Sequence, residues 1–78
     1  MTNEYLLKSL EELYADLGKA VADHNGHSIS VTSCCYAEEF NEALRCISLA
    51  ESAGRRVSLI IINIQRLLNY ASKSRGDN

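Results

Sequence analysis

The sequence predicts an all-α protein, either a helical hairpin or a three-helix unit, that pairs with a second copy into a dimeric bundle. Apolar residues recur at steps of three and four along most of the chain, which is typical of amphipathic helices. The chain contains no proline to interrupt a helix. Apolar residues make up 46% of only 78 positions, more apolar surface than so short a chain buries alone. Residues 1–74 are expected to form one helical domain, followed by a frayed tail at 75–78.

The first helix is predicted over residues 3–24. Leucines and one alanine at alternating steps of four and three form its apolar stripe: Leu6, Leu10, Leu13, Leu17 and Ala20. The charged residues of this segment fall largely outside that stripe. The helix is expected to end at Asn25-Gly26, because glycine readily adopts the left-handed conformation that closes helices.

Residues 27–35 differ in character from the first helix. Ile29 and Val31 alternate with serine and threonine, a short extended pattern with no second strand to pair with. We therefore expect an extended linker that packs Ile29 and Val31 onto the helices.

Two more helices are predicted over residues 35–53 and 56–73, with one long helix kinked at Gly54 as the alternative. The four-three stepping continues across both without losing phase: Tyr36, Phe40, Ala43, Ile47, Ala50, Gly54, Val57, Ile61, Ile64, Leu68 and Ala71. An interior glycine costs about 1 kcal/mol relative to alanine. One continuous helix would also extend well beyond the first helix. Both considerations favour a turn or sharp kink near Gly54.

The C-terminal helix is apolar nearly all the way round, so one or two neighbouring helices do not cover it. We expect a second copy to cover the remainder, while the alternative is the central helix of a monomeric three-helix bundle. The predicted self-association interface is Val57, Leu59, Ile61, Ile62, Ile64 and Leu68.

Charge is distributed unevenly along the chain. Residues 1–42 carry two lysines against eight acidic residues, a net −6, whereas residues 43–78 carry six basic against two acidic residues, a net +4. The two halves therefore attract each other, within one chain or between two. The overall charge of −2 argues against a nucleic-acid partner. A helix-turn-helix around Gly54 is a third-ranked alternative, because its recognition helix would consist mainly of isoleucine and leucine.

Four residues in or beside the linker resemble a metal site: His24, His27, Cys34 and Cys35. Adjacent cysteine side chains point apart, so we expect no bound metal and no other cofactor. A redox role is the alternative, because a cysteine at the N-terminus of a helix has a lowered thiol pKa. Structural cysteines are the expectation here.

No nucleophile–base pair and no phosphate-binding loop is recognisable, so the sequence predicts no enzyme. There is no export signal and no apolar run long enough for a membrane, which predicts a cytoplasmic protein. The expected role is a non-catalytic regulator or inhibitor of adaptor or antiactivator type, from a bacterium or phage. It would act as a homodimer and bind an unidentified protein, with Arg55 and Arg56 as candidate partner-facing residues. A small metal- or redox-responsive regulator is the runner-up.

Overall fold

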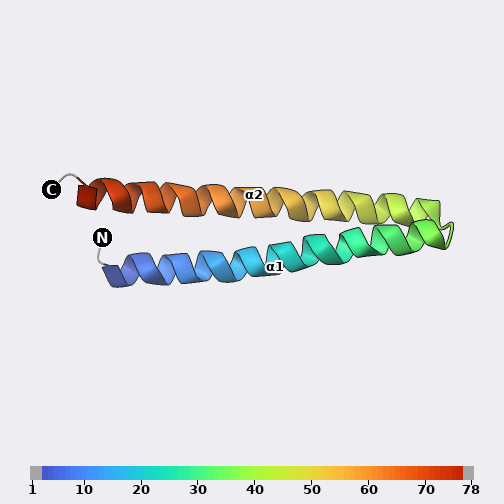
Figure 1. Cartoon of the computed structure of the whole chain (residues 1–78), viewed down its shortest axis with the longest axis horizontal. Coiled ribbons are helices and arrows are strands. Elements are labelled where there is room, and N and C mark those ends of the chain that lie inside the picture. The colour runs from blue at the N-terminus through green and yellow to red at the C-terminus, as the bar shows by residue number, and fades with distance from the viewer. Residues whose placement is uncertain (1–2, 77–78) are drawn as a thin grey trace.

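The computed structural model describes residues 3–76 as two long helices that run antiparallel to each other (Figure 1). Helix α1 spans Asn3–Tyr36, helix α2 spans Phe40–Gly76, and a turn at 37–39 joins them. The start of α1 and the end of α2 lie at the same end of the molecule, opposite the turn. No strand occurs in the described range, so the all-α prediction is confirmed in the form of a hairpin.

Helix α1 does not end at Asn25-Gly26, and residues 27–35 are helical rather than an extended linker. Hydroxyls in this segment bond back to the carbonyl four residues earlier: Ser28 Oγ to His24 O at 2.8 Å, Ser30 Oγ to Gly26 O at 3.1 Å and Thr32 Oγ1 to Ser28 O at 3.5 Å. The short polar side chains are thereby accommodated inside a helix. Packing against α2 supplies the stability that local propensity lacks.

The turn predicted near Gly54 is also wrong, because α2 runs through this residue without interruption. The predicted helices 35–53 and 56–73 therefore do not exist as separate elements. A long second helix was not expected because it would extend beyond a first helix that ended near residue 24. Helix α1 is itself 34 residues long, so the two helices are similar in length. Of the predicted tail, residues 75 and 76 belong to α2, and residues 77–78 lie outside the described range.

The chain reverses direction through a Schellman motif at the end of α1. The Glu39 amide donates to the Cys34 carbonyl at 2.8 Å, and the Glu38 amide donates to the Cys35 carbonyl at 3.1 Å. Glu38 adopts the left-handed conformation, with φ of 58°, at the position where glycine is usual. The Glu39 carbonyl then accepts from the Ala43 amide at 3.0 Å, which starts α2.

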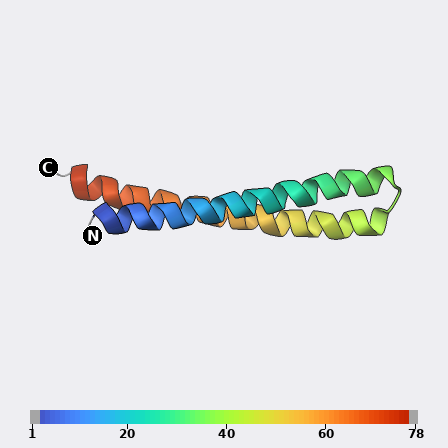
Figure 2. The ribbon, with the colours of Figure 1, turned by 90° about the horizontal axis from the view of Figure 1, so that it is seen from below.

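The two helices share one seam of buried and half-buried residues, and they wrap across each other along it (Figure 2). In α1 the seam consists of Leu6, Leu10, Leu13, Leu17, Ala20, His24, His27, Val31 and Cys34. In α2 it consists of Ala43, Cys46, Ala50, Ala53, Val57, Ile60, Ile64, Leu67 and Ala71. Unbroken steps of three and four in both helices are the heptad pattern of a coiled coil.

One half of the predicted α2 seam is confirmed and the other half is displaced by one residue. The heptad positions Ala43, Ala50, Val57, Ile64 and Ala71 do lie in the seam. Their alternating partners are Cys46, Ala53, Ile60 and Leu67, where the sequence pattern gave Ile47, Gly54, Ile61 and Leu68. Helix α2 therefore carries two adjacent apolar stripes, and α1 packs against only one of them.

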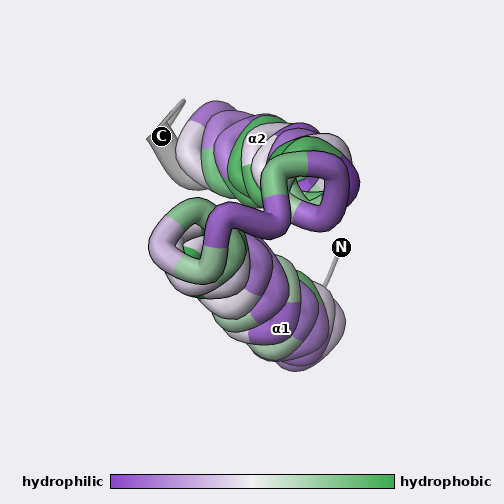
Figure 3. Tube along the Cα trace, turned by 90° about the vertical axis from the view of Figure 1, so that its right-hand side faces the viewer, coloured by the Kyte–Doolittle hydropathy of each residue, from purple (hydrophilic) through white to green (hydrophobic). Residues whose placement is uncertain are grey.

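The hairpin is long and thin, measuring 60 × 17 × 13 Å. Its radius of gyration is 17.6 Å, against about 11.5 Å for a compact chain of this length. The buried residues within the described range are mostly small: Ala20, Ala43, Cys46, Ala50, Ala53 and Ile64. Viewed along its length, apolar segments of both helices are visible on the outside (Figure 3). One chain thus leaves much apolar surface exposed.

Candidate functional site

The residues that flank the seam divide the hairpin into two sides with different chemistry. In an antiparallel coiled coil, heptad position e of one helix lies beside e of the other, and g lies beside g. The ion pair between Arg56 Nη1 and Asp23 Oδ2, at 3.4 Å, joins the helices across the g positions. This polar side comprises Ser9, Asp16, Asp23 and Ser30 of α1 with Glu42, Leu49, Arg56, Asn63 and Tyr70 of α2.

The e positions of the opposite side carry no charged residue as far as Leu68, and we call this stretch the apolar face. The next e position, Arg75, lies beyond it in the last turn of α2. It comprises Leu7, Tyr14, Val21, Ser28 and Cys35 of α1 with Phe40, Ile47, Gly54, Ile61 and Leu68 of α2. Its seven large apolar side chains are all exposed, from 39% for Val21 and Ile47 to 61% for Phe40. Burial of such side chains is worth about 1.5–3 kcal/mol each. The apolar face is therefore the strongest candidate for a protein contact.

The six residues predicted to form the self-association interface lie on three different surfaces. Val57 and Ile64 pack in the seam, where Ile64 is only 7% exposed. Ile61 and Leu68 lie on the apolar face. Leu59 and Ile62 lie on the outer side of α2, away from α1.

This outer side of α2 carries a second apolar group framed by arginines, which we call the outer ridge: Arg55, Leu59, Ile62 and Arg66. Leu59 is 61% exposed and Ile62 is 41% exposed. Arg55 Nη2 donates to Ser52 Oγ at 3.2 Å, so its guanidinium lies along the helix surface. Of the two predicted partner-facing arginines, Arg55 lies on this ridge, whereas Arg56 is paired on the polar side.

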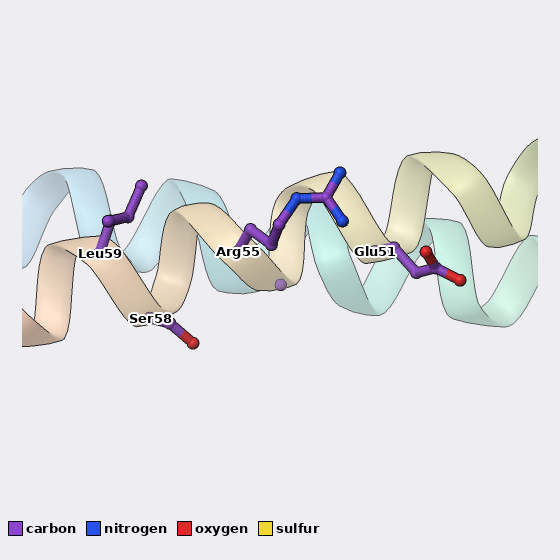
Figure 4. A pocket seen from close by; sticks show the side chains of 5 residues that line it. Glu51, Arg55, Ser58 and Leu59 are labelled. Carbon is purple, nitrogen blue, oxygen red and sulfur yellow. The ribbon is translucent and has the colours of Figure 1, made fainter.

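A shallow hollow lies beside the ridge, where Gly54 has no side chain to fill the surface (Figure 4). Its lining comes from α2 alone: Glu51, Gly54, Arg55, Ser58 and Leu59. Leu59 and the stem of Arg55 bound it on one side and the Glu51 carboxylate lies at the other end. The hollow is open to solvent, and two polar groups in its lining, Glu51 and Ser58, are seven residues apart on α2.

The structure separates the residues considered as metal ligands. His24 and Cys34 are ten residues apart on the same helix, which corresponds to about 15 Å. The His24 ring also makes a hydrogen bond within the hairpin, because its Nδ1 lies 2.9 Å from the Ala50 carbonyl oxygen. No group of three or more histidine, cysteine or acidic side chains among residues 3–76 is arranged to hold a metal ion.

The cysteines do not lie where the sequence-based argument for a reactive thiol placed them. Cys34 and Cys35 lie in the last turn of α1, not at the N-terminus of a helix as the redox argument required. Burial raises the pKa of the Cys34 thiol, and Cys46 across the seam together with Glu39 and Glu42 raises it further. Cys34 and Cys46 are seam residues, whereas Cys35 is exposed on the apolar face.

Few charged groups are used to hold the hairpin together. Glu42 accepts hydrogen bonds from Arg45 Nε at 3.0 and 3.1 Å within α2, and this contact lowers the pKa of the Glu42 carboxyl group. Within the described range, the ion pair that links the two helices is Asp23–Arg56. Most charges of both helices therefore face outward.

The seam, its heptad spacing and the tight turn define the chain as an antiparallel coiled-coil hairpin. Comparison of the chain with protein-family models, curated proteins and solved structures found no match. Neither described helix combines the length and apolar character that crossing a membrane requires.

Proposed function

We propose that this chain is a non-catalytic protein-binding regulator or inhibitor that acts as a homodimer in the cytoplasm. The observation that carries the proposal is the exposure of large apolar side chains along the apolar face and the outer ridge. Adaptors and antiactivators of bacterial or phage origin need such anchors and no catalytic constellation, which is why we place the chain in this class.

The amount of exposed surface supports a role in protein binding. The chain exposes 5928 Å², whereas a compact protein of 8.7 kDa exposes about 4,700 Å². The difference, about 1,200 Å², exceeds the ~800 Å² that each partner buries in a typical stable interface. Large apolar side chains exposed side by side mark interaction sites in soluble proteins.

The outer ridge is the surface that we assign to the second protein. Leu59 and Ile62 are spaced as successive anchors on one side of a helix, which fits recognition by an apolar groove. Arg55 and Arg66 flank these anchors, so the rim of that groove should be acidic. The ridge lies on the opposite side of α2 from α1, and it stays accessible when the apolar face is covered.

Two measurements test this proposal. Sedimentation equilibrium at micromolar concentration should give twice the chain mass. For the second protein, the wild-type chain, Leu59→Glu and Asn69→Glu serve as matched baits, since Asn69 is exposed one heptad beyond Ile62. A specific partner should be retained by the wild type and Asn69→Glu and lost by Leu59→Glu. A partner that binds all three baits equally would contradict the assignment of the ridge, and a monomeric wild type would contradict the homodimer.

A further inference from the structure

We propose that the apolar face is the contact between two copies of the chain, with α1 of each copy over α2 of the other and both turns at the same end. The result is an antiparallel four-helix bundle. This inference rests on the self-association proposed above and adds which surface is used and how the copies are oriented.

The choice of the apolar face follows from comparing the surfaces of the hairpin. The ten e positions from Leu7 to Cys35 and from Phe40 to Leu68 are all uncharged, and the one charged e position of the described helices, Arg75, lies in the last turn of α2. The polar side includes Asp16, Asp23, Glu42 and Arg56, whose charges would lose hydration in a contact. The outer ridge offers only two large apolar side chains between arginines. Only the apolar face combines length, continuity and freedom from charge.

The excess exposed surface of the hairpin is large enough to supply the contact of a stable dimer. The chain exposes about 1,200 Å² more than a compact protein of its mass. That excess is larger than the area that each subunit of a typical stable dimer buries, about 800 Å². The two copies would then share a core two layers thick in place of a single seam.

Charge selects the orientation of the second copy. Helix α1 contains five acidic and two basic residues, a net −3, and α2 contains two acidic and six basic residues, a net +4. Two hairpins stacked face to face by a two-fold axis along their length place α1 over α2. A two-fold axis across their length would instead place each helix over its own copy. Coulomb attraction favours the first arrangement and repulsion disfavours the second.

The absence of a side chain at Gly54, at the centre of the apolar face, fits this arrangement of the two copies. The register of Asp23–Arg56 places Val21 level with Gly54 across the hairpin. In the stacked pair, Val21 of the second copy would therefore stand over Gly54, where no side chain projects. A Cβ atom at Gly54 would lie 3.6 Å from the His24 ring, an ordinary contact, so the hairpin itself does not require glycine there. Close approach of a second copy does give it a role.

The first experiment compares two neighbouring isoleucines by analytical ultracentrifugation. Ile61 lies on the apolar face at 48% exposure and Ile62 lies on the outer ridge at 41%. We expect Ile61→Glu to raise the dimer dissociation constant at least a hundredfold and Ile62→Glu to change it less than threefold. Circular dichroism checks that both variants remain helical, as expected for exposed positions.

The second experiment tests the orientation with a native cysteine. Cys35 is exposed on the apolar face beside the turn. Turns at the same end bring the two Cys35 thiols close together, whereas turns at opposite ends separate them by most of the 60 Å length. A short bismaleimide should give a covalent dimer with the wild type and with Cys34→Ser, but not with Cys35→Ser.

The outcomes separate this inference from the proposed function. If the wild type sediments as a monomer, self-association itself fails. If the wild type is a dimer that Ile61→Glu leaves intact, or that both glutamate variants disrupt, the choice of face is wrong. If the wild-type dimer forms no Cys35-dependent covalent product, the orientation is wrong and the proposed homodimer still stands.

Discussion

At the scale of single residues, His24 shows how a polar side chain is accommodated in the seam. Its Nδ1 lies 2.9 Å from the Ala50 carbonyl oxygen of the other helix. A carbonyl oxygen only accepts hydrogen bonds, so Nδ1 must carry the hydrogen. The ring lies beside Gly54, where a Cβ atom would make an ordinary contact with it at 3.6 Å. This contact joins the second half of α1 to the first third of α2.

Glu38 carries a conformational cost that a single substitution removes. Its φ of 58° is left-handed, which costs a residue with a Cβ atom about 1 kcal/mol. We expect Glu38→Gly to raise the free energy of unfolding by about that amount in urea titrations. The control is Glu39→Gly, because Glu39 has no positive φ and glycine there adds only flexibility to the unfolded chain. A loss of stability in Glu38→Gly would contradict the geometry of this turn.

At the scale of the elements, the heptad pattern explains why the first half of α1 was predicted correctly and the second half was not. The apolar stripe from Leu6 to Ala20 correctly predicted the first half of α1. Its continuation runs through His24 and His27, polar residues that concealed the pattern. Gly26 and the Ser/Thr-rich segment after it favour a break by local propensity. Packing along the seam overrides that preference, and propensity alone does not reveal it.

Helix α2 poses a different difficulty, because its two apolar stripes share the column that includes Val57 and Ile64. Either stripe completes a heptad seam, and the larger side chains of the second stripe, such as Ile47 and Ile61, made it appear to be the core. The inner stripe includes Cys46 and Ala53, small residues that allow the two helices to approach closely. The sequence alone does not say which stripe α1 covers, so the apolar face was not separable from the core.

Continuity of α1 can be tested at Gly26, which the sequence marked as a helix end. The residue is helical and exposed, and a Cβ atom there would meet nothing within 4 Å. Gly26→Ala should therefore raise the free energy of unfolding by about 1 kcal/mol. Gly18→Ala, in the half of α1 that was predicted correctly, should give the same gain. A destabilised Gly26→Ala protein beside a stabilised Gly18→Ala protein would show that α1 is not continuous.

At the scale of the whole molecule, folding and pairing should be linked. A hairpin that buries mainly alanines contributes little hydrophobic free energy of its own. We therefore expect the melting temperature of the wild type to rise with protein concentration from about 10 µM to 1 mM, because association stabilises only the folded state. The melting temperature of Ile61→Glu should be lower and independent of concentration. Identical melting curves for the wild type across this range would contradict the linkage.

The unbroken seam also determines which changes in length the hairpin tolerates. Deleting one residue near Gly26 would rotate the rest of α1 by about 100°, moving Val31 and Cys34 out of contact with α2. Deleting seven residues from each helix, on both sides of the turn, would instead preserve every remaining pairing and shorten the rod by about 10 Å. The length of the hairpin can therefore be changed in whole heptads, and the polar side and the apolar face keep their remaining residues in the same positions.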